Sequence, residues 1–396
     1  MLINNLNSIE LFSGAGGLAL GMAKSGFQHK MLVEFNHDAV NTLFKNHNEG
    51  QTQIKEWNIK HDDVRNISFE KYKGNISVVA GGPPCQPFSL GGKHKAFNDH
   101  RDMFPQAVRA VRESQPSSFI FENVKGLLRK NFSTYFNYII LQLTYPNIIK
   151  KNDENWEAHL FRLEKLHNED NYQGLKYNVF FKLLNAADYG VPQKRERVFI
   201  IGFRSDTNIK WSFPQKTHSH DALLWEQWVT GEYWKRLNIS SFEHPAYDTK
   251  VKNISTRLQK KYGLFPPQEK PWVTIREATK DLPCPKEQNN FDNHYFKDGA
   301  KSYPGHTGSP IDEPSKTLKA GNHGVPGGEN MIRFNDGSIR YLTIREAARI
   351  QTFPDDYHIS GTWSECMRQI GNAVPVTLSE VVAKSVFDAI KNRALP

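Results

Sequence analysis

The sequence has few cysteines and no long hydrophobic run, and each absence narrows the class of protein. Its 396 residues include three cysteines, Cys85, Cys284 and Cys366. Their spacing matches neither a zinc site nor a set of paired disulfides, so we expect no metal site and a reducing, cytoplasmic environment. No apolar stretch is long enough to cross a membrane, and the chain opens with no signal-like segment. We therefore expect no membrane association.

Acidic residues are in the minority. Lysine and arginine number 51 against 42 aspartate and glutamate residues, which gives a formal net charge of +9. A positive balance suits a polyanionic partner such as nucleic acid, although mild basicity alone is weak evidence. The length is sufficient for a sizeable core and for two domains.

One stretch rich in glycine and proline holds a cysteine. The segment is Gly81-Gly82-Pro83-Pro84-Cys85-Gln86-Pro87-Phe88-Ser89, and it follows the apolar run 75–80, which we expect to be a buried strand. Prolines fix the backbone on both sides of Cys85, and glycines allow a sharp turn and the close approach of a ligand. A thiol presented in this way is suited to nucleophilic attack. A buried structural cysteine is the alternative.

A second expected strand, residues 116–124, ends in a carboxylate, Glu122, after an expected helix at 103–114. In a parallel sheet, neighbouring strands end at the same edge, and that edge binds ligands. We therefore expect Cys85 and Glu122 to lie close together.

A glycine-rich turn lies near the start of the chain. Residues 8–12 indicate a strand, 13–21 a turn entering a helix, and 29–35 a second strand that carries Glu34 near its end. This pattern matches the dinucleotide-binding fingerprint and is compatible with a nicotinamide or flavin enzyme. The same architecture binds S-adenosylmethionine, whose ribose also requires a carboxylate. The fingerprint leaves these cofactors open.

Three motifs together carry a resemblance. Gly-Pro-Pro-Cys-Gln-Pro-Phe-Ser at 82–89, Phe-Glu-Asn-Val at 121–124 and Gln-Lys-Arg-Glu-Arg at 193–197 resemble the DNA (cytosine-5) methyltransferases, specifically the bacterial modification enzymes of restriction systems. The resemblance implies an α/β fold: a Rossmann-like domain that binds S-adenosylmethionine, at 1–204 and continued by 340–396, with a smaller, irregular target-recognition domain at 205–339. It implies double-stranded DNA as the partner. We expect a monomer that is paired in function with a restriction endonuclease without a stable complex.

The resemblance also implies a cofactor site. Phe12 and Phe35 would form the adenine slot, Glu34 would bind the ribose and Asp63 the adenine amino group. Asp62 competes for the last role, and a solvated loop or a helix cap is the alternative for both aspartates. The full set of implied cofactor residues is Phe12, Ser13, Gly14, Gly16, Gly17, Glu34, Phe35, Asp63, Pro84, Asn372 and Ala373.

The implied catalytic residues are Cys85, Glu122, Arg195 and Arg197. Cys85 would add to carbon 6 of a flipped-out cytosine, Glu122 would act at N3 and Arg197 would reach O2. Because Arg195 and Arg197 are two apart at the start of an expected strand, we expect them to point the same way.

DNA contacts are expected in two places. Segment 91–101, rich in glycine and positive charge, would close on the duplex, with Gln86, Ser89, Lys93 and Arg101 as the expected contacts. An ordinary exposed linker is the alternative. Thr317 and Leu318, with the glycine-rich stretch 321–328, are expected to carry sequence specificity; a loop that only packs the small domain is the alternative.

Other stretches receive simpler interpretations. Residues 145–172 are polar and helix-prone, and we assign them no function. The five-residue segments that begin at Thr274 and Thr343 are alike because both are capping boxes, so we infer no internal repeat. An amphipathic helix is expected to end near Ile390. Three rival functions remain at this point: an RNA (tRNA) cytosine-5 methyltransferase, a nicotinamide oxidoreductase and a catalytically silent DNA-binding regulator.

Overall fold

The computed structural model describes residues 6–49, 54–84, 102–169, 171–320 and 330–393. Cys85, Gln86, Ser89, Lys93, Arg101 and the stretch 321–328 lie outside the described residues. The chain divides into two compact units. The first unit comprises Met1–Leu184, Glu196–Phe213 and Glu380–Pro396, and the second comprises Asn185–Arg195 and Pro214–Ser379. Residues 340–379, which we expected to be part of the catalytic domain, belong to the second unit. The functional division into two domains stays a prediction.

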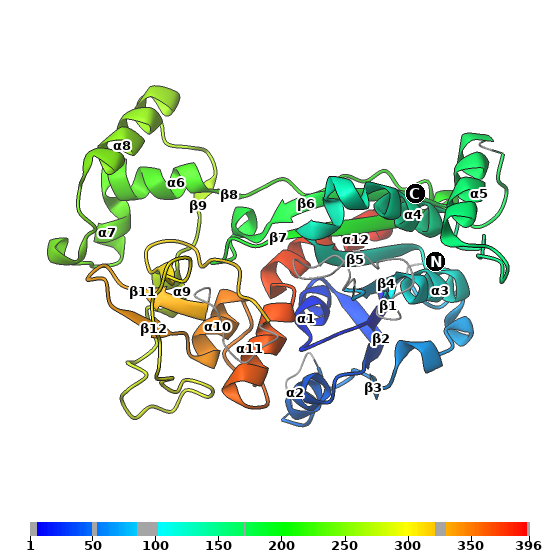
Figure 1. Cartoon of the computed structure of the whole chain (residues 1–396), viewed down its shortest axis with the longest axis horizontal. Helices are drawn as coiled ribbons and strands as arrows, with labels where there is room; N and C mark the ends of the chain where they lie inside the picture. Colours follow the sequence, from blue (N-terminus) through cyan, green and yellow to red (C-terminus); the bar gives the residue numbers. More distant parts are fainter. Residues whose placement is uncertain (1–5, 50–53, 85–101, 170, 321–329, 394–396) are drawn as a thin grey trace. The chain divides into compact units, whose positions relative to one another are not determined.

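Seven strands form the main sheet: β1 (Leu6–Leu11), β2 (Phe27–Glu34), β3 (Ile59–His61), β4 (Val78–Gly81), β5 (Ser118–Val124), β6 (Tyr177–Asn185) and β7 (Glu196–Arg204). Their order is β3-β2-β1-β4-β5-β7-β6 (Figure 1). The pairs β1 with β2, β1 with β4, β2 with β3 and β4 with β5 are parallel, whereas β7 runs antiparallel to β5. The expected α/β, Rossmann-like architecture is confirmed.

The helices of the first unit are α1 (Gly17–Lys24), α2 (His37–Asn48), α3 (Phe104–Ser114), α4 (Ser133–Thr144), α5 (Trp156–Glu169) and most of α12 (Val376–Arg393). The helix expected at 103–114 is therefore found as α3. The helix-prone stretch 145–172 contains α5. The terminal helix extends past its expected end at Ile390.

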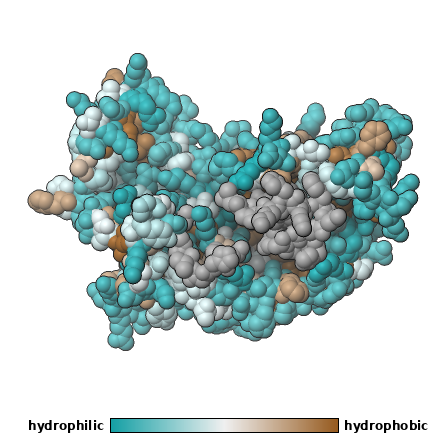
Figure 2. All heavy atoms as spheres, in the orientation of Figure 1, coloured by the Kyte–Doolittle hydropathy of each residue, from teal (hydrophilic) through white to brown (hydrophobic). Residues whose placement is uncertain are grey.

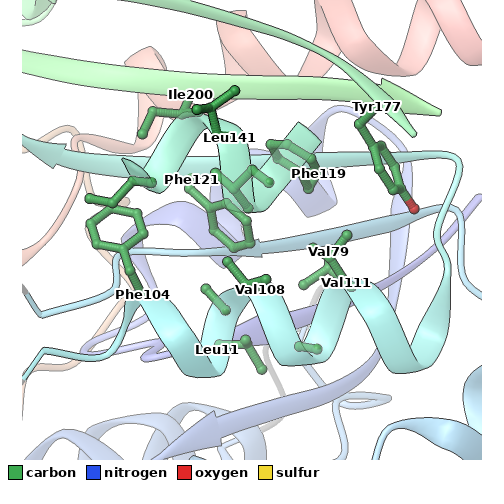
Figure 3. Packing of buried hydrophobic residues seen from close by; sticks show 14 of the residues in the cluster. Leu11, Val79, Phe104, Val108, Val111, Phe119, Phe121, Leu141, Tyr177 and Ile200 are labelled. Carbon is green, nitrogen blue, oxygen red and sulfur yellow. The ribbon is translucent and has the colours of Figure 1, made fainter. Parts of the chain in front are cut away.

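The core of the first unit lies between α3, α4 and the sheet. Apolar residues of α3 recur at helical spacing, Phe104, Val108 and Val111, so one face of the helix is apolar and buried. Figure 3 shows this face packed toward β4 and β5. The rings of Phe119 and Phe121 stack with centroids 5.2 Å apart. These contacts fix β5, and with it the position of Glu122.

The second unit is built from short elements. They are β8 (His218–Ser219), β9 (Lys270–Pro271), β10 (Ser309–Pro310), β11 (Met331–Arg333), β12 (Ile339–Tyr341), α6 (His220–Trp225), α7 (Glu232–Arg236), α8 (Thr249–Tyr262), α9 (Ile275–Thr279), α10 (Ile344–Ile350) and α11 (Trp363–Asn372). Both expected capping boxes are present, at Thr274 and Thr343. Some aromatic residues of this region form a small core, in which Tyr233 and Trp234 pack against Leu223, whereas others, such as Phe242 and Phe265, are exposed.

The described residues include no helix with the length and apolar character needed to cross a bilayer. On the face in Figure 2, hydrophilic residues predominate and hydrophobic ones form small separate groups.

Candidate active site

A tight turn joins β1 to α1. Gly14 and Gly16 have φ angles of 52° and 83°, and Phe12 has a φ of 57°. This left-handed region suits glycine but is strained for a bulky side chain. The strain at Phe12 lies where the chain reverses to begin α1, whose first backbone N–H groups lack intrahelical partners. Within the turn, the N–H of Ser13 donates to the carbonyl of Val33 and that of Gly16 to the carbonyl of Ser13, which fixes its shape at the carboxyl end of β1.

Glu34 lies against the glycine turn. Its Oε2 accepts the N–H of Gly14 at 2.7 Å, and its Oε1 accepts the N–H of Asn36 at 2.7 Å. The next residue, Phe35, is 71% exposed although it is large and apolar. A fixed carboxylate beside an exposed aromatic ring fits the ribose and adenine of a nucleoside cofactor, because those groups require an acceptor and an apolar wall.

Asp63 caps a short helical turn. Its Oδ1 accepts the N–H and the Nε–H of Arg65, each at 2.9 Å, and the ion pair with Arg65 lowers the pKa of the Asp63 carboxyl. Oδ1 of Asp62 accepts the side-chain amide of Asn66 at 2.9 Å. The helix cap, which was the alternative interpretation for these aspartates, is thus observed for Asp63. Oδ1 of each aspartate already accepts two donors, so any further donor would have to bind at Oδ2, which in Asp63 accepts the Nη2–H of Arg65 and keeps one lone pair.

The end of β4 is pressed against its neighbours. A Cβ atom at Gly81 would lie 2.4 Å from the carbonyl oxygen of Leu11, and one at Gly82 would lie 3.3 Å from Oε2 of Glu122. The side-chain amide of Asn123 donates to the carbonyl of Pro83 at 2.9 Å. Strands β4 and β5 are parallel, as expected, so the strand that leads toward Cys85 ends beside Glu122. Only glycine fits at the first of these positions.

Glu122 pairs with Arg197. The Nε atom of Arg197 lies 2.9 Å from Oε1 of Glu122, and the two side chains are 13% and 9% exposed. Burial lowers the pKa of the Arg197 guanidinium, and the charge of Glu122 opposes this effect. Arginine stays protonated in proteins, so the site holds a carboxylate and a cation in contact, shielded from most of the solvent.

Arg195 has different surroundings. Its buried guanidinium donates to the carbonyls of Leu318 at 3.1 Å, Gly371 at 2.7 Å and Ala373 at 3.0 Å. Arg195 and Arg197 thus have different partners. We expected them to point the same way, but β7 begins at Glu196, so the strand alternation behind that expectation does not extend to Arg195.

Thr317 and Leu318 are bound by Gln193 and Lys194, the two residues that precede Arg195. The hydroxyl of Thr317 donates to the carbonyl of Lys194 at 2.8 Å, and the Leu318 N–H donates to Oε1 of Gln193 at 3.0 Å. Leu318 is 1% exposed, so its side chain packs in the interior. Asn372, at the end of α11, is exposed.

Two residues of this region have no predicted role. Glu10, on β1, is buried; burial raises the pKa of its carboxyl well above the usual value, and the charge of Glu34 adds to the rise. Among the described residues, its Oε2 has no hydrogen-bond partner. Glu10 could have been singled out in the sequence, because it is a carboxylate between two apolar residues of an expected strand. Asn123 belongs to the Phe-Glu-Asn-Val motif. Its hydrogen bond to the carbonyl of Pro83 ties the end of β5 to the residues that follow β4.

Known proteins similar to this chain are DNA methylases. The family of C-5 cytosine-specific DNA methylases matches residues 6–145 and 152–388. The type II methyltransferase M.PspPI of Psychrobacter sp. (strain TA137) is 32% identical over 383 residues, which is 96% of this chain and 78% of that protein. The type II methyltransferase M.Eco47II of Escherichia coli is 33% identical over 398 residues, or 98% of this chain and 82% of that protein.

Solved structures share the fold. The Entamoeba histolytica methyltransferase EhMeth has a TM-score of 0.57 at 16% identity, with 97% of this chain and 98% of that chain covered. The S. pombe Dnmt2 methyltransferase has a TM-score of 0.53 at 16% identity, with 98% of each chain covered. From the match over nearly its whole length, the chain belongs to the C-5 cytosine-specific DNA methylase family, and its activity is that of a DNA (cytosine-5) methyltransferase.

Proposed function

We propose that the protein methylates carbon 5 of a flipped-out cytosine through a covalent bond to Cys85, with S-adenosylmethionine as the methyl donor. One observation carries the proposal. The ion pair of Glu122 and Arg197 lies at the end of β5, beside the end of β4, and the chain continues from β4 through Gly82, Pro83 and Pro84 to Cys85.

The chemistry requires this combination because carbon 5 of cytosine is a poor nucleophile. The thiolate of Cys85 forms a carbon–sulfur bond at carbon 6, while Glu122 in its protonated form protonates or hydrogen-bonds N3, so the electron pair of the 5,6 double bond becomes available at carbon 5. Carbon 5 would then bond to the methyl carbon that S-adenosylmethionine supplies, as the bond from that carbon to the positively charged sulfur breaks. Loss of the carbon-5 proton to water, return of the N3 proton to Glu122 and cleavage of the bond to Cys85 restore the ring and the thiolate.

Arg197 supports this step by charge and by geometry. Its guanidinium has five donors, of which one is directed at Glu122 and one at the backbone carbonyl of Glu196, 2.8 Å away. We assign a further donor to O2 of the cytosine. Carbon 5 is inaccessible inside a duplex, so the base must leave the stack to reach the pair. Gln86, Ser89, Lys93 and Arg101 are the proposed contacts to the surrounding duplex.

The cofactor would be held at the carboxyl ends of β1, β2 and β3. Glu34 is proposed for the ribose, Phe12 and Phe35 for the adenine ring, and Asp63 for the adenine amino group, with Asp62 as its competitor. The backbone of Ser13, Gly14, Gly16 and Gly17 would line the methionine end. Pro84, Asn372 and Ala373 complete the proposed set.

The names of relatives support a biological role. Proteins about 30% identical to this chain over nearly its full length are type II methyltransferases by name. We propose that the protein, as a monomer, modifies a specific DNA sequence and so protects it from a cognate restriction endonuclease. No stable complex with that endonuclease is needed, because the methyl group itself carries the signal.

Trapping tests the mechanism. Duplex DNA in which cytosine is replaced by 5-fluorocytosine should form a denaturation-stable adduct in the presence of cofactor, because fluorine cannot leave as the proton does. The Cys85→Ala variant should form none. Cys284, which is exposed, and Cys366, which is buried, provide matched controls: their alanine variants should still trap. An adduct with Cys85→Ala would assign the nucleophile to another residue.

RNA is the alternative substrate class. Transfer of a labelled methyl group to duplex DNA and to tRNA, measured side by side, separates the two. Preferential labelling of tRNA would refute the DNA assignment. A bisulfite read of DNA from cells that express the protein then identifies the methylated sequence.

A further inference from the structure

A backbone hydrogen bond joins the residues on either side of the segment that carries Cys85. Pro84 precedes that segment and Asp102 follows it. The N–H of Met103 donates to the carbonyl of Pro84 at 3.1 Å. Oδ1 of Asp102 accepts the N–H of Phe104, the first residue of α3, at 3.2 Å. Asp102 therefore fixes the start of α3 and the residue that is bonded to Pro84.

The second oxygen of Asp102 is also engaged. Oδ2 accepts a short hydrogen bond from the hydroxyl of Tyr135, on α4. Tyr135 is 4% exposed and belongs to the main core cluster. A bond from a hydroxyl to a carboxylate is stronger than one between neutral groups. Phenylalanine would fill the same apolar space without a polar atom to desolvate, so the hydroxyl is explained by the position it imposes on Asp102.

Helix α5 packs against Tyr135. The ring of Trp156, the first residue of α5, lies edge-on to that of Tyr135 with centroids 6.4 Å apart, and 5.7 Å from the ring of Tyr138. Hydrogen bonds hold α5 in place, because Nδ1 of His159 lies 2.8 Å from the Tyr138 hydroxyl and Nε2 lies 2.8 Å from the carbonyl of Ile148.

The electrostatics of this region agree with the contacts. The pKa of the Tyr138 hydroxyl is raised chiefly by burial, and the carboxylates of Glu154 and Asp102 raise it further. The field of Asp102 thus reaches the junction of α4 and α5. Stretch 145–172, to which no function was assigned, contributes α5 to this junction.

We propose that Tyr135, braced by Trp156, is a positioning residue: through Asp102 it holds Met103 against Pro84 and thereby sets where the segment with Cys85 is attached. The inference rests on the proposed role of Cys85. It gives α5 a task in the reaction, because Trp156 restricts the ring of Tyr135 by packing alone.

The test uses two tyrosines of the same region. Tyr135→Phe removes the hydroxyl that binds Asp102. Tyr145→Phe is the matched control, since it removes the hydroxyl of another buried tyrosine, one that lies 3.0 Å from Nδ1 of His167. For each variant, the thermal midpoint, the cofactor affinity and the single-turnover rate of covalent trapping with 5-fluorocytosine DNA are measured on the full chain.

We expect Tyr135→Phe to slow trapping about tenfold, as the loss of a hydrogen bond to a charged group implies. Cofactor affinity should stay as in the unaltered protein, and the shift in thermal midpoint should be similar for both variants. Trapping in Tyr145→Phe should keep the unaltered rate. If the two variants trap at the same rate, the inference is wrong. If the unaltered protein does not trap at all, it is the proposed function that fails.

A double-mutant cycle adds a second readout. If Tyr135 acts through Asp102, the effects of Tyr135→Phe and Asp102→Asn on the trapping rate should be non-additive, with the double variant no slower than the worse single one. Trp156→Leu should give a smaller slowing of the same kind. Strictly additive effects would show that Tyr135 does not act through Asp102.

Discussion

The Nε atom of Arg197 lies 2.9 Å from Oε1 of Glu122, and both side chains are largely withdrawn from water. A second ion pair nearby is a useful contrast, since Lys125 and Glu196 lie 2.7 Å apart but are 60% and 46% exposed. The buried pair is the costly one, because its charges give up solvation. A surface pair contributes little to stability. The difference suggests that the buried pair is retained for its chemistry.

Glu122→Gln should therefore lower the rate of methyl transfer by about 10²- to 10⁴-fold, the range of a lost general acid–base group. The amide keeps the shape of the side chain but cannot donate a proton to N3. Glu196→Gln is the control and should leave the rate within about twofold, since an exposed pair of this kind is worth about 1 kcal/mol or less. Single-turnover methylation of duplex DNA with labelled cofactor measures both. Equal rates for Glu122→Gln and the control would remove Glu122 from the chemistry.

Glu34→Ala should weaken cofactor binding about tenfold or more and leave DNA binding unchanged. Its carboxylate already accepts the N–H groups of Gly14 and Asn36, so the variant loses the ribose acceptor and two fixed points of the turn. Glu49→Ala, which removes an exposed carboxylate directly after α2, is the control. Calorimetric titration with S-adenosylmethionine compares them. An unchanged affinity would place the ribose elsewhere.

Asp62 and Asp63 can be separated in the same assay. If Asp63 binds the adenine amino group, Asp63→Ala should weaken cofactor binding about three- to tenfold, the range of one hydrogen bond, and Asp62→Ala less. Because Asp63 also pairs with the Arg65 side chain, Arg65→Ala serves as a control for loss of that ion pair alone, since the backbone N–H that Asp63 caps remains. A loss with Arg65→Ala equal to that with Asp63→Ala would mean that the aspartate acts only through its ion pair with Arg65. A larger loss with Asp62→Ala would reverse the assignment.

Strands β1, β2, β4 and β5 could be predicted from the sequence because they are largely buried and read as apolar runs. The neighbouring ends of β4 and β5 followed from the same reasoning. The surroundings of the two arginines did not follow. Arg197 reaches Glu122 because β7 is antiparallel to β5, with Val124 opposite Arg197, and strand direction cannot be read from a local pattern.

Arg195 illustrates the limit further. Its partners are the carbonyls of Leu318, Gly371 and Ala373, which lie 123, 176 and 178 residues away in the chain. No periodicity in the sequence encodes such contacts. Local capping could be predicted more easily, since the capping boxes at Thr274 and Thr343 depend only on residues three apart. The cap at Asp63 is equally local, and it appeared among the alternatives.

Stability should fall between pH 6.5 and 4 because of His29. This residue of β2 is buried, with Nε2 donating to the carbonyl of Ala19 at 2.9 Å, and burial lowers the pKa of its imidazole to about 4. The unfolded imidazole titrates near 6.5, so in this window the unfolded state binds more protons than the folded one. The contribution of the neutral imidazole is complete above pH 6.5 and is lost as the pH falls.

Between pH 7.5 and pH 5, the free energy of unfolding should therefore drop by about 2 kcal/mol more in the unaltered protein than in His29→Gln, which cannot titrate. Urea unfolding at the two pH values gives the comparison. The absolute stability of the variant does not matter, because only its change with pH is used. The same change in both proteins would mean that His29 is not held neutral by the fold.

Residues 205–339 should confer their sequence specificity on a related enzyme into which they are grafted. A flipped cytosine and phosphates carry no sequence information directly, so discrimination requires groups that reach the base edges in the major groove. Buried Leu318 cannot be such a group by its side chain. We expect Leu318 instead to anchor the start of the stretch that follows it, because its backbone is bound by Gln193 and Arg195. The contacts to bases are then expected from the residues that follow, in 321–328.

Grafting 205–339 into a related methyltransferase should transfer the methylated sequence, provided that the host has the same Gln-x-Arg segment to bind the backbone of Leu318. A second chimera that carries the whole second unit, residues 185–195 and 214–379, brings the anchor with its own partners. Bisulfite sequencing of host DNA reads the outcome. Transfer by either chimera supports the assignment, and transfer by the second alone shows that the anchor must be matched. An active chimera of either kind that keeps the host's original specificity would refute it, because the base-reading groups would then lie outside the grafted residues.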